Sequence, residues 1–258
     1  MSARKRLIAG AAFFMGAALI AGAIWIYADM QRQLDDATPE PSPVTMTKPY
    51  PNGFPMVDWE FWESINPDII GWVTIPETSI DLPIVQGPAE DPDYYLSHDI
   101  YKNPNANGCP YLDAECAEMG LLSRNCVIFA HHSSNGAMFS DLAKYSDLEF
   151  ANEHPRILLQ TPEWRATLMP RMVDVVNASK EPKQVIFEDD AEFDSWWQEK
   201  RSDVTLDIDA AETPARAYSF VTCSYNTWKN ERTIVYASKR GWTVWPEANP
   251  PEVSEAVG

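Results

Sequence analysis

The sequence predicts a mainly β domain with helical insertions, folded as an eight-stranded β-barrel and carried on a single N-terminal transmembrane helix. Three observations lead to this fold class. Eight short β-prone segments follow one another with turn residues between them, a spacing typical of a closed or nearly closed barrel. Two segments with helical periodicity interrupt the strands. A long apolar stretch stands near the N-terminus, ahead of all of them.

The apolar stretch, residues 7–27, contains no charged side chain. At about 1.5 Å of rise per residue, a helix of this length reaches roughly 30 Å and can cross a bilayer. A cleaved signal peptide is the alternative, but its apolar region would be only about 7–15 residues long and would end at small residues. This stretch instead ends Ile-Trp-Ile-Tyr, so we expect residues 7–28 to be an uncleaved anchor. Basic residues at positions 4–6 precede it and Asp29 follows, which keeps residues 1–6 in the cytoplasm and places the rest outside the cell.

The remaining chain divides into a stalk, one domain and a tail. Residues 29–55 carry six prolines in polar sequence and are expected to form a stiff stalk. Residues 56–246 have the length of one globular domain with a sizeable core. Residues 247–258 are acidic and are expected to form a flexible tail.

The formal net charge of −18 argues against nucleic acid or anionic lipid as a partner, because both would be repelled.

Within the domain, the first expected element is a helix from Trp59, with Asp58 as its N-cap and Pro67 beyond its end. The expected strands are residues 70–75, 80–85, 109–112, 125–130, 156–161, 166–176, 216–223 and 233–239. The two helical insertions are expected at residues 137–145 and 191–201, each with one apolar face toward the core.

The strongest chemical signal lies at the end of the seventh strand. That run delivers Cys223 to a strand end, and Arg232 stands nine residues further on, on the next expected strand. A thiol nucleophile beside a permanent cation can attack a carbonyl and have the developing oxyanion stabilised. Another apolar run ends in His131 and His132, and a histidine and a cysteine distant in sequence are the usual ingredients of a Cys-His enzyme. The strand face that turns toward the cysteine decides which of the two histidines acts.

A zinc site is the competing interpretation of these residues. Adjacent residues on a strand point to opposite faces, so His131 and His132 cannot easily share one ion. No Cys-x-x-Cys or His-Glu-x-x-His spacing is present, and we expect no metal and no other cofactor. If Cys223 stays reduced, Cys109, Cys116 and Cys126 allow at most one bridge. A Cys109–Cys126 disulfide would need a Cα separation under about 7 Å.

Several longer motifs make the chain resemble a known family over residues 57–240. They begin at Asn66 (Asn-Pro-Asp-Ile-Ile-Gly-Trp), Ile80 (Ile-Asp-Leu-Pro-Ile-Val-Gln), Asp93 (Asp-Tyr-Tyr-Leu-Ser-His-Asp), Ala130 (Ala-His-His) and Thr222 (Thr-Cys-Ser-Tyr). Together with Arg232 they resemble the sortases, the cysteine transpeptidases of Gram-positive cell surfaces, and specifically the class B type. The helix around Trp196 looks like the extra helix of that class.

The resemblance assigns roles to individual residues. Cys223 matches the nucleophile, Arg232 the essential arginine and His131 the catalytic histidine, because the seven-residue step to Met138 sets that register and excludes His132. It also implies substrate contacts at four positions: Thr222, Leu96, Ser224 and Tyr225. Two departures from the family pattern bear on substrate fit. Ala130 stands where glycine usually precedes the histidine, and Val221 stands where a small hydroxyl residue is usual.

The function implied is cleavage of an Asn-Pro-x-Thr-like sorting signal near the C-terminus of a surface protein. A thioacyl enzyme would form and pass the protein to an amine, typically on a peptidoglycan precursor. The enzyme would be a single-pass protein of the cell membrane, attached through residues 7–28. Two alternatives remain open: a sortase that polymerises pilins through a lysine, and a catalytically silent surface binding domain with a sortase-like barrel.

Overall fold

The computed structural model describes residues 53–179, 183–210, 212–223 and 230–239. The expected cytoplasmic segment, the membrane anchor, residues 29–52 of the stalk and the tail lie outside these ranges. Among the described residues, no helix is both long enough and apolar enough to cross a membrane.

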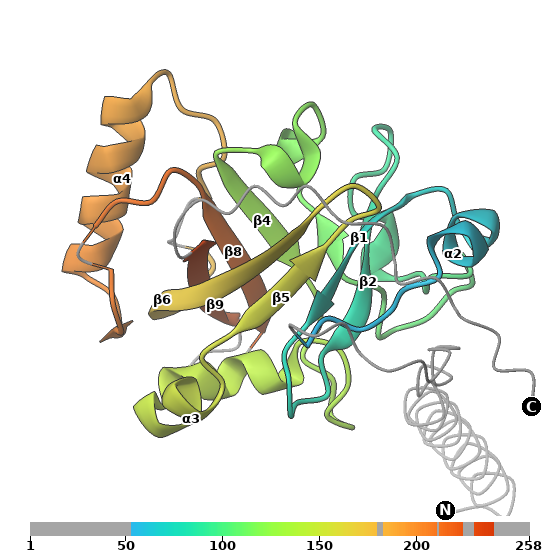
Figure 1. The fold of residues 1–258 in the computed structure, drawn as a ribbon, viewed down its shortest axis with the longest axis horizontal. Coiled ribbons are helices and arrows are strands. Elements are labelled where there is room, and N and C mark those ends of the chain that lie inside the picture. Colours follow the sequence, from blue (N-terminus) through green and yellow to red (C-terminus); the bar gives the residue numbers. More distant parts are fainter. Residues whose placement is uncertain (1–52, 180–182, 211, 224–229, 240–258) are drawn as a thin grey trace, which may run out of the picture. The chain divides into compact units, whose positions relative to one another are not determined.

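The core of the domain is a closed ring of eight strands, which confirms the predicted barrel (Figure 1). Around the ring the strands run in the order β5-β1-β2-β3-β4-β8-β9-β6, and pairing of β5 with β6 closes it. A ninth strand, β7, adds a two-residue ladder to β6. The bounds are β1 Ile69–Thr74, β2 Asp81–Gln86, β3 Tyr111–Leu112, β4 Asn125–Phe129, β5 Ile157–Gln160, β6 Arg165–Asn177, β7 Leu206–Asp207, β8 Ala217–Cys223 and β9 Glu231–Lys239.

Most neighbouring strands are antiparallel, but β2 pairs parallel with β3, and β4 pairs parallel with β8. The pair of β4 and β8 matters for the site. Two parallel strands end at the same edge of a sheet, so the residues that follow β4 and the last residues of β8 lie together. Strand β9 pairs antiparallel with β8 and therefore starts at that same edge.

Helices pack against the outside of the barrel (Figure 1). The α-helices are α2 Trp59–Ile65, α3 Leu148–Glu153 and α4 Asp190–Ser202, and the 3₁₀ helices are η1 Tyr94–Leu96, η2 Ala114–Cys116, η3 Gly120–Leu122 and η4 Ser140–Ser146. The carboxylate of Asp58 caps α2 by accepting from the amide of Phe61 at 3.0 Å, as expected. The buried face of α4 is also as expected, and Phe193, Trp196 and Trp197 pack on β6 and β9.

The insertion predicted at residues 137–145 differs from the prediction. Met138 has a left-handed backbone with φ of 56°, so no helix runs through it, and the helix that forms is η4. Phe139, Leu142 and Tyr145 are all completely buried. Their spacing of three residues matches the three residues per turn of a 3₁₀ helix, so one side faces the core without an α-helix.

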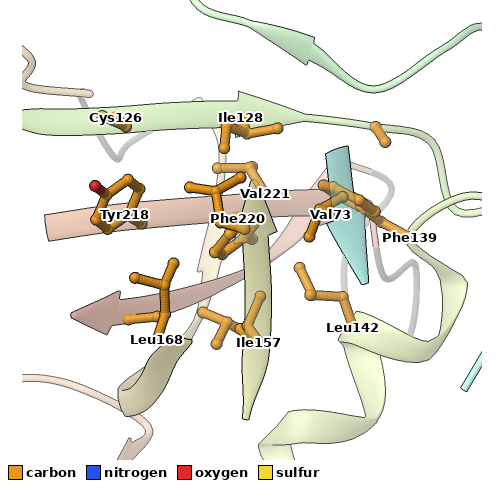
Figure 2. Close-up of a cluster of buried hydrophobic side chains, with 14 of the residues drawn as sticks. Val73, Cys126, Ile128, Phe139, Leu142, Ile157, Leu168, Tyr218, Phe220 and Val221 are labelled. Carbon is orange, nitrogen blue, oxygen red and sulfur yellow. The ribbon is translucent and has the colours of Figure 1, made fainter. Parts of the chain in front are cut away.

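The barrel interior is filled by alternate residues of its strands (Figure 2). Cys126 and Ile128 of β4 lie beside their register partners on the neighbouring strand β8, Tyr218 and Phe220, and all four are at most 1% exposed. Because side chains alternate along a strand, the residues between them lie on the outer face. This parity decides which residues of β4 and β8 can take part in a surface site.

Cys109, Cys116 and Cys126 are buried free thiols. Cys116 and Cys126 belong to the barrel core, whereas Cys109 packs in a separate cluster beneath α2, so the Cys109–Cys126 bridge is not formed. Burial raises the pKa of all three thiols. At neutral pH they are therefore protonated and unreactive, which leaves Cys223 as the candidate nucleophile.

Candidate active site

The strand register brings three sequence-predicted positions to one edge of the barrel. In the antiparallel pair of β8 and β9, Cys223 lies directly opposite Arg232. In the parallel pair of β4 and β8, Phe129 lies opposite Val221, and the amide of Ala130 continues the ladder by donating to the carbonyl of Val221 at 3.1 Å. His131 follows Ala130 just beyond the end of β4, at the same edge of the sheet as Cys223 at the end of β8.

These positions belong to the outer face of the barrel. Ser219 and Val221 have the same parity on β8 as Cys223, and Arg232, as a directly paired residue, shares their face. A cavity of about 290 Å³ lies over this face. Its floor is mainly apolar, with Val127, Val221 and Ile234, and the guanidinium-bearing Arg232 also lines it. The cavity therefore extends from the edge that carries the candidate catalytic residues.

The far wall of the cavity is the segment that leads into α4, and polar contacts fix it to the barrel. Asn125 is 2% exposed, and its side-chain amide donates to the carbonyl of Gln184 at 2.8 Å. Its oxygen accepts from the hydroxyl of Ser219 at 2.7 Å. The ammonium of Lys183 contacts the carboxylate of Asp113 at 2.5 Å. The wall is thus held in place by β4, β8 and the start of η2.

His131 is held by a backbone group of η1. Its Nε2 lies 2.8 Å from the carbonyl oxygen of Leu96. A carbonyl only accepts hydrogen bonds, so Nε2 carries the proton in this arrangement. On the other side, the carbonyl of His131 accepts from the amide of Phe139 at 3.0 Å, and His132 bridges to Met138. The choice of His131 over His132 as the catalytic histidine stays a prediction.

Arg232 is placed to act on a developing negative charge. It is partly exposed, it lines the cavity, and its Nη1 donates to the carbonyl of Glu231 at 3.3 Å. Within the part of the chain that the structure describes, no carboxylate lies within ion-pair distance of this guanidinium. The positive charge is therefore not neutralised by a described neighbour.

The predicted substrate contacts have different outcomes. Leu96 lies beside His131, and its side chain is 41% exposed. Thr222 is 1% exposed and lies on the interior face of β8, so it can influence substrate geometry only through its backbone. Ser224 and Tyr225 lie outside the described residues. No group of three or more His, Cys, Asp or Glu residues suited to a metal ion occurs in the ranges that the structure describes.

Thr222 faces Thr233 of β9 in the barrel interior, and neither buried hydroxyl oxygen has a hydrogen-bond partner among the residues that the structure describes. A buried hydroxyl without a partner destabilises a fold by about 1–3 kcal/mol. Thr233→Val removes such a group at nearly constant shape and is expected to raise the free energy of unfolding by about 1 kcal/mol. Urea denaturation of both proteins measures this difference.

The matched control is Thr161→Val. The hydroxyl of Thr161 is also buried, but it accepts from the amides of Glu163 and Trp164 at 3.2 and 3.1 Å. This variant is expected to lose about 1–2 kcal/mol, because two donors lose their acceptor. Equal destabilisation of both variants would mean that the hydroxyl of Thr233 has a partner after all.

Sequence reasoning missed two features of the site. The tether between Asn125 and Gln184 joins residues 59 positions apart, and a lone asparagine at the start of an apolar strand was its only sequence signal. The carbonyl of Leu96 is a backbone atom and has no sequence signature. Both features depend on how distant segments pack.

Known proteins match this chain over most of the described domain. The family model of the sortase domain matches residues 73–240. Sortase B of Listeria monocytogenes is 40% identical over 93 residues, a match that spans 36% of this chain and only 37% of that protein. Sortase B of Staphylococcus aureus is 24% identical over 182 residues, which are 70% of this chain and 73% of the relative. The solved structure of Clostridium perfringens sortase B has a TM-score of 0.64 and 25% identity, and the match covers 70% of this chain and 99% of that one.

Proposed function

The chain belongs to the sortase family and is of the sortase B type, and from this premise we propose that it anchors surface proteins to the cell wall. It would cleave a C-terminal sorting signal that resembles Asn-Pro-x-Thr and transfer the protein to a peptidoglycan precursor amine. The observation that carries this proposal is the strand register, which sets Cys223 opposite Arg232, beside a cavity that Arg232 lines, and ends β4 at the same edge just before His131.

The proposed reaction has two steps. The sulfur of Cys223 attacks the carbonyl carbon of the threonine in the signal, and a tetrahedral intermediate forms with its negative charge near Arg232. The carbon–nitrogen bond then breaks, and His131 donates a proton to the departing amine. An acceptor amine attacks the resulting thioester, forms the new amide and releases the thiol. The proton that the acceptor amine loses returns to the pair of Cys223 and His131, which restores the protonation state at the start of the reaction.

The cavity is proposed to hold the residues of the signal that precede the threonine. Its apolar floor suits a proline ring, and the side chains of Ser219 and Gln184 offer polar groups to an asparagine amide. Val221 stands at the position nearest to the nucleophile on the same face, where other class B members carry a small hydroxyl residue. The fit around this valine is therefore expected to set the preference of this chain among related signals.

The proposed setting is the outer face of the cell membrane. The apolar character of residues 7–28 and the basic residues before them support a single-pass anchor with a cytoplasmic N-terminus. An enzyme and a substrate held in one membrane meet at a high effective concentration. A tethered sortase therefore needs only modest turnover.

The test uses the full-length chain in detergent with a panel of fluorogenic Asn-Pro-x-Thr-x peptides, with and without an amine acceptor. Mass spectrometry follows the adduct on Cys223. A threonine-linked thioacyl adduct that transfers to a glycine-type amine supports cell-wall anchoring. Transfer only to a lysine of a pilin peptide would instead indicate a pilin-polymerising sortase. A folded protein with a free Cys223 that forms no adduct with any peptide would indicate a silent binding domain.

A further inference from the structure

The Asn-Pro-Asp motif at residues 66–68 has no part in the chemistry described so far, yet the structure connects it to the catalytic histidine. We propose that this motif positions His131 through Tyr95 and the backbone carbonyl of Leu96, and thereby fixes the imidazole with its proton on Nε2. The inference rests on the proposed function in one respect, namely that His131 is the proton donor. Its tautomer can be measured independently of any activity.

The hydrogen bond from Nε2 to Leu96 determines which nitrogen reacts. In a neutral imidazole one nitrogen bears the proton, and the partner of that nitrogen sets the tautomer. The carbonyl of Leu96 accepts from Nε2 at 2.8 Å, so Nε2 keeps its proton in both the neutral and the charged ring. Nδ1 is then the nitrogen that gains and loses a proton during the reaction.

The peptide that carries this carbonyl is fixed by the backbone on both sides. The amide of Leu96 donates to the carbonyl of Asp93 at 2.9 Å. The preceding carbonyl, of Tyr95, accepts from the amide of Cys109 at 2.9 Å, and the following one, of Ser97, accepts from Asn105 at 2.9 Å. With its neighbours held in this way, the carbonyl of Leu96 has little freedom to rotate away from the histidine.

Tyr95 anchors this turn to the motif. Its ring is completely buried beneath α2, and its hydroxyl donates to a carboxylate oxygen of Asp68 at 2.6 Å. The same hydroxyl accepts from the side-chain amide of Asn66 at 2.8 Å. Asn66 is also fully buried, and its side-chain oxygen accepts from the amide of Asp68 at 3.0 Å. The first and third residues of the motif therefore hold the hydroxyl of Tyr95 together.

The carboxylate of Asp68 stays charged at neutral pH. Burial acts to raise the pKa of Asp68, but hydrogen bonds from Tyr95 and Lys102 outweigh it and hold the pKa below its usual range. The ammonium of Lys102 lies 2.9 Å from Oδ2 of Asp68, the same oxygen that accepts from the hydroxyl of Tyr95. Asp68 therefore remains an acceptor for the tyrosine under the conditions in which the enzyme would work.

Gly108 packs closely against the backbone carbonyls of Tyr95 and Leu96. Its φ is +61°, a left-handed conformation that favours glycine. A Cβ atom at this position would lie 2.4 Å from the carbonyl oxygen of Tyr95 and 2.9 Å from that of Leu96. Gly108→Ala would therefore push directly on the carbonyl that holds His131.

The direct test is the tautomer of His131 in the full-length chain labelled with ¹⁵N-histidine. A long-range ¹H–¹⁵N correlation spectrum, with His131→Ala used to assign the signal, shows which nitrogen bears the proton. The expected result is protonation at Nε2. A neutral ring protonated at Nδ1 would overturn the proposal, whether or not any peptide is cleaved.

Two variants test the connection to the motif. Gly108→Ala is expected to shift the tautomer balance and to lower kcat by roughly 100-fold, because small misplacements of a reacting group are costly. Tyr95→Phe keeps the ring and removes the hydroxyl, and is expected to shift the tautomer balance in the same direction and lower kcat by about tenfold. In both variants KM is expected to change less than kcat, because neither Tyr95 nor Gly108 lines the cavity that is proposed to hold the peptide.

Each control makes the same kind of substitution at a position away from His131. Gly120→Ala replaces a glycine of similar conformation, with φ of +56°, where a Cβ meets nothing within 4 Å. Tyr145→Phe removes another buried hydroxyl, which donates to the carbonyl of His154 at 2.8 Å. Both controls are expected to keep the native tautomer and kcat. Native values in Gly108→Ala and Tyr95→Phe as well would overturn the positioning role.

The two proposals fail in distinguishable ways. If the native protein cleaves no peptide but shows Nε2 protonation that Tyr95→Phe and Gly108→Ala disturb, the positioning of His131 stands and the proposed substrate is wrong. If cleavage proceeds through an adduct on Cys223 while the tautomer is indifferent to both variants, the enzyme assignment stands and the role of the motif is structural.

Discussion

Replacement of Cys223 by alanine is expected to reduce peptide cleavage by roughly 10⁵–10⁶-fold, the scale seen when a nucleophile is removed from a catalytic set that acts as a unit. Without the sulfur no thioester forms, so neither hydrolysis nor transfer has a route through the enzyme. The measurement combines a fluorogenic assay with the intact mass of the protein after incubation with peptide. The variant should show no mass increase at any peptide concentration.

The control for this change is Cys109→Ala. Cys109 is 4% exposed, and burial raises the pKa of its thiol, so it is not a competing nucleophile. This variant is expected to lose some stability and to keep both the adduct and the turnover. Iodoacetamide should likewise modify native protein at Cys223 and leave the buried thiols untouched under folded conditions. Cleavage by Cys223→Ala within tenfold of the native rate would rule out the thioester route.

The barrel was predictable because its signal is local. Alternation such as Cys126 and Ile128, or Tyr218 and Phe220, marks each strand separately, and the number of strands indicates closure. The two-residue strand β7 and the short helix α3 carry too few residues for a periodic signal, and neither was predicted. The insertion at residues 137–145 was assigned to the wrong kind of helix because its apolar side was taken as α-helical. Its spacing of three, visible in Phe139, Leu142 and Tyr145, is the 3₁₀ spacing.

The candidate site was predictable to the extent that it depends on neighbouring strands. Cys223 and Arg232 are joined by one short connection, so an antiparallel pairing that sets them opposite each other follows from their spacing. The place of His131 depends on the parallel pairing of β4 with β8, across more than ninety residues. The resemblance to the sortases predicts His131 as the catalytic histidine, and this role stays a prediction. The contacts of the Leu96 carbonyl with His131 and of Asn125 with Gln184 could not be predicted, because the partner in each is a backbone carbonyl, which leaves no trace in the sequence.

Replacement of Arg232 by alanine is expected to lower kcat by roughly 10²–10³-fold, the usual cost of losing one group that stabilises an oxyanion. The guanidinium lines the cavity on the face of Cys223, and none of the described carboxylates neutralises it. Arg232→Lys retains the charge but loses the planar fork of donors, so it is expected to recover only part of the loss. Steady-state kinetics of the three proteins with one peptide measures these effects.

The division of the loss between kcat and KM decides what the arginine does. A group that acts on the transition state alone lowers kcat and kcat/KM equally, whereas a group that only holds the peptide raises KM and leaves kcat unchanged. Arg171→Lys is the matched control, because the guanidinium of Arg171 is engaged on the outer side of β6 with Ser238 and Asp209. It is expected to change neither constant. If Arg232→Ala raises KM with native kcat, the arginine is a peptide anchor, and oxyanion stabilisation has to come from backbone amides near Cys223.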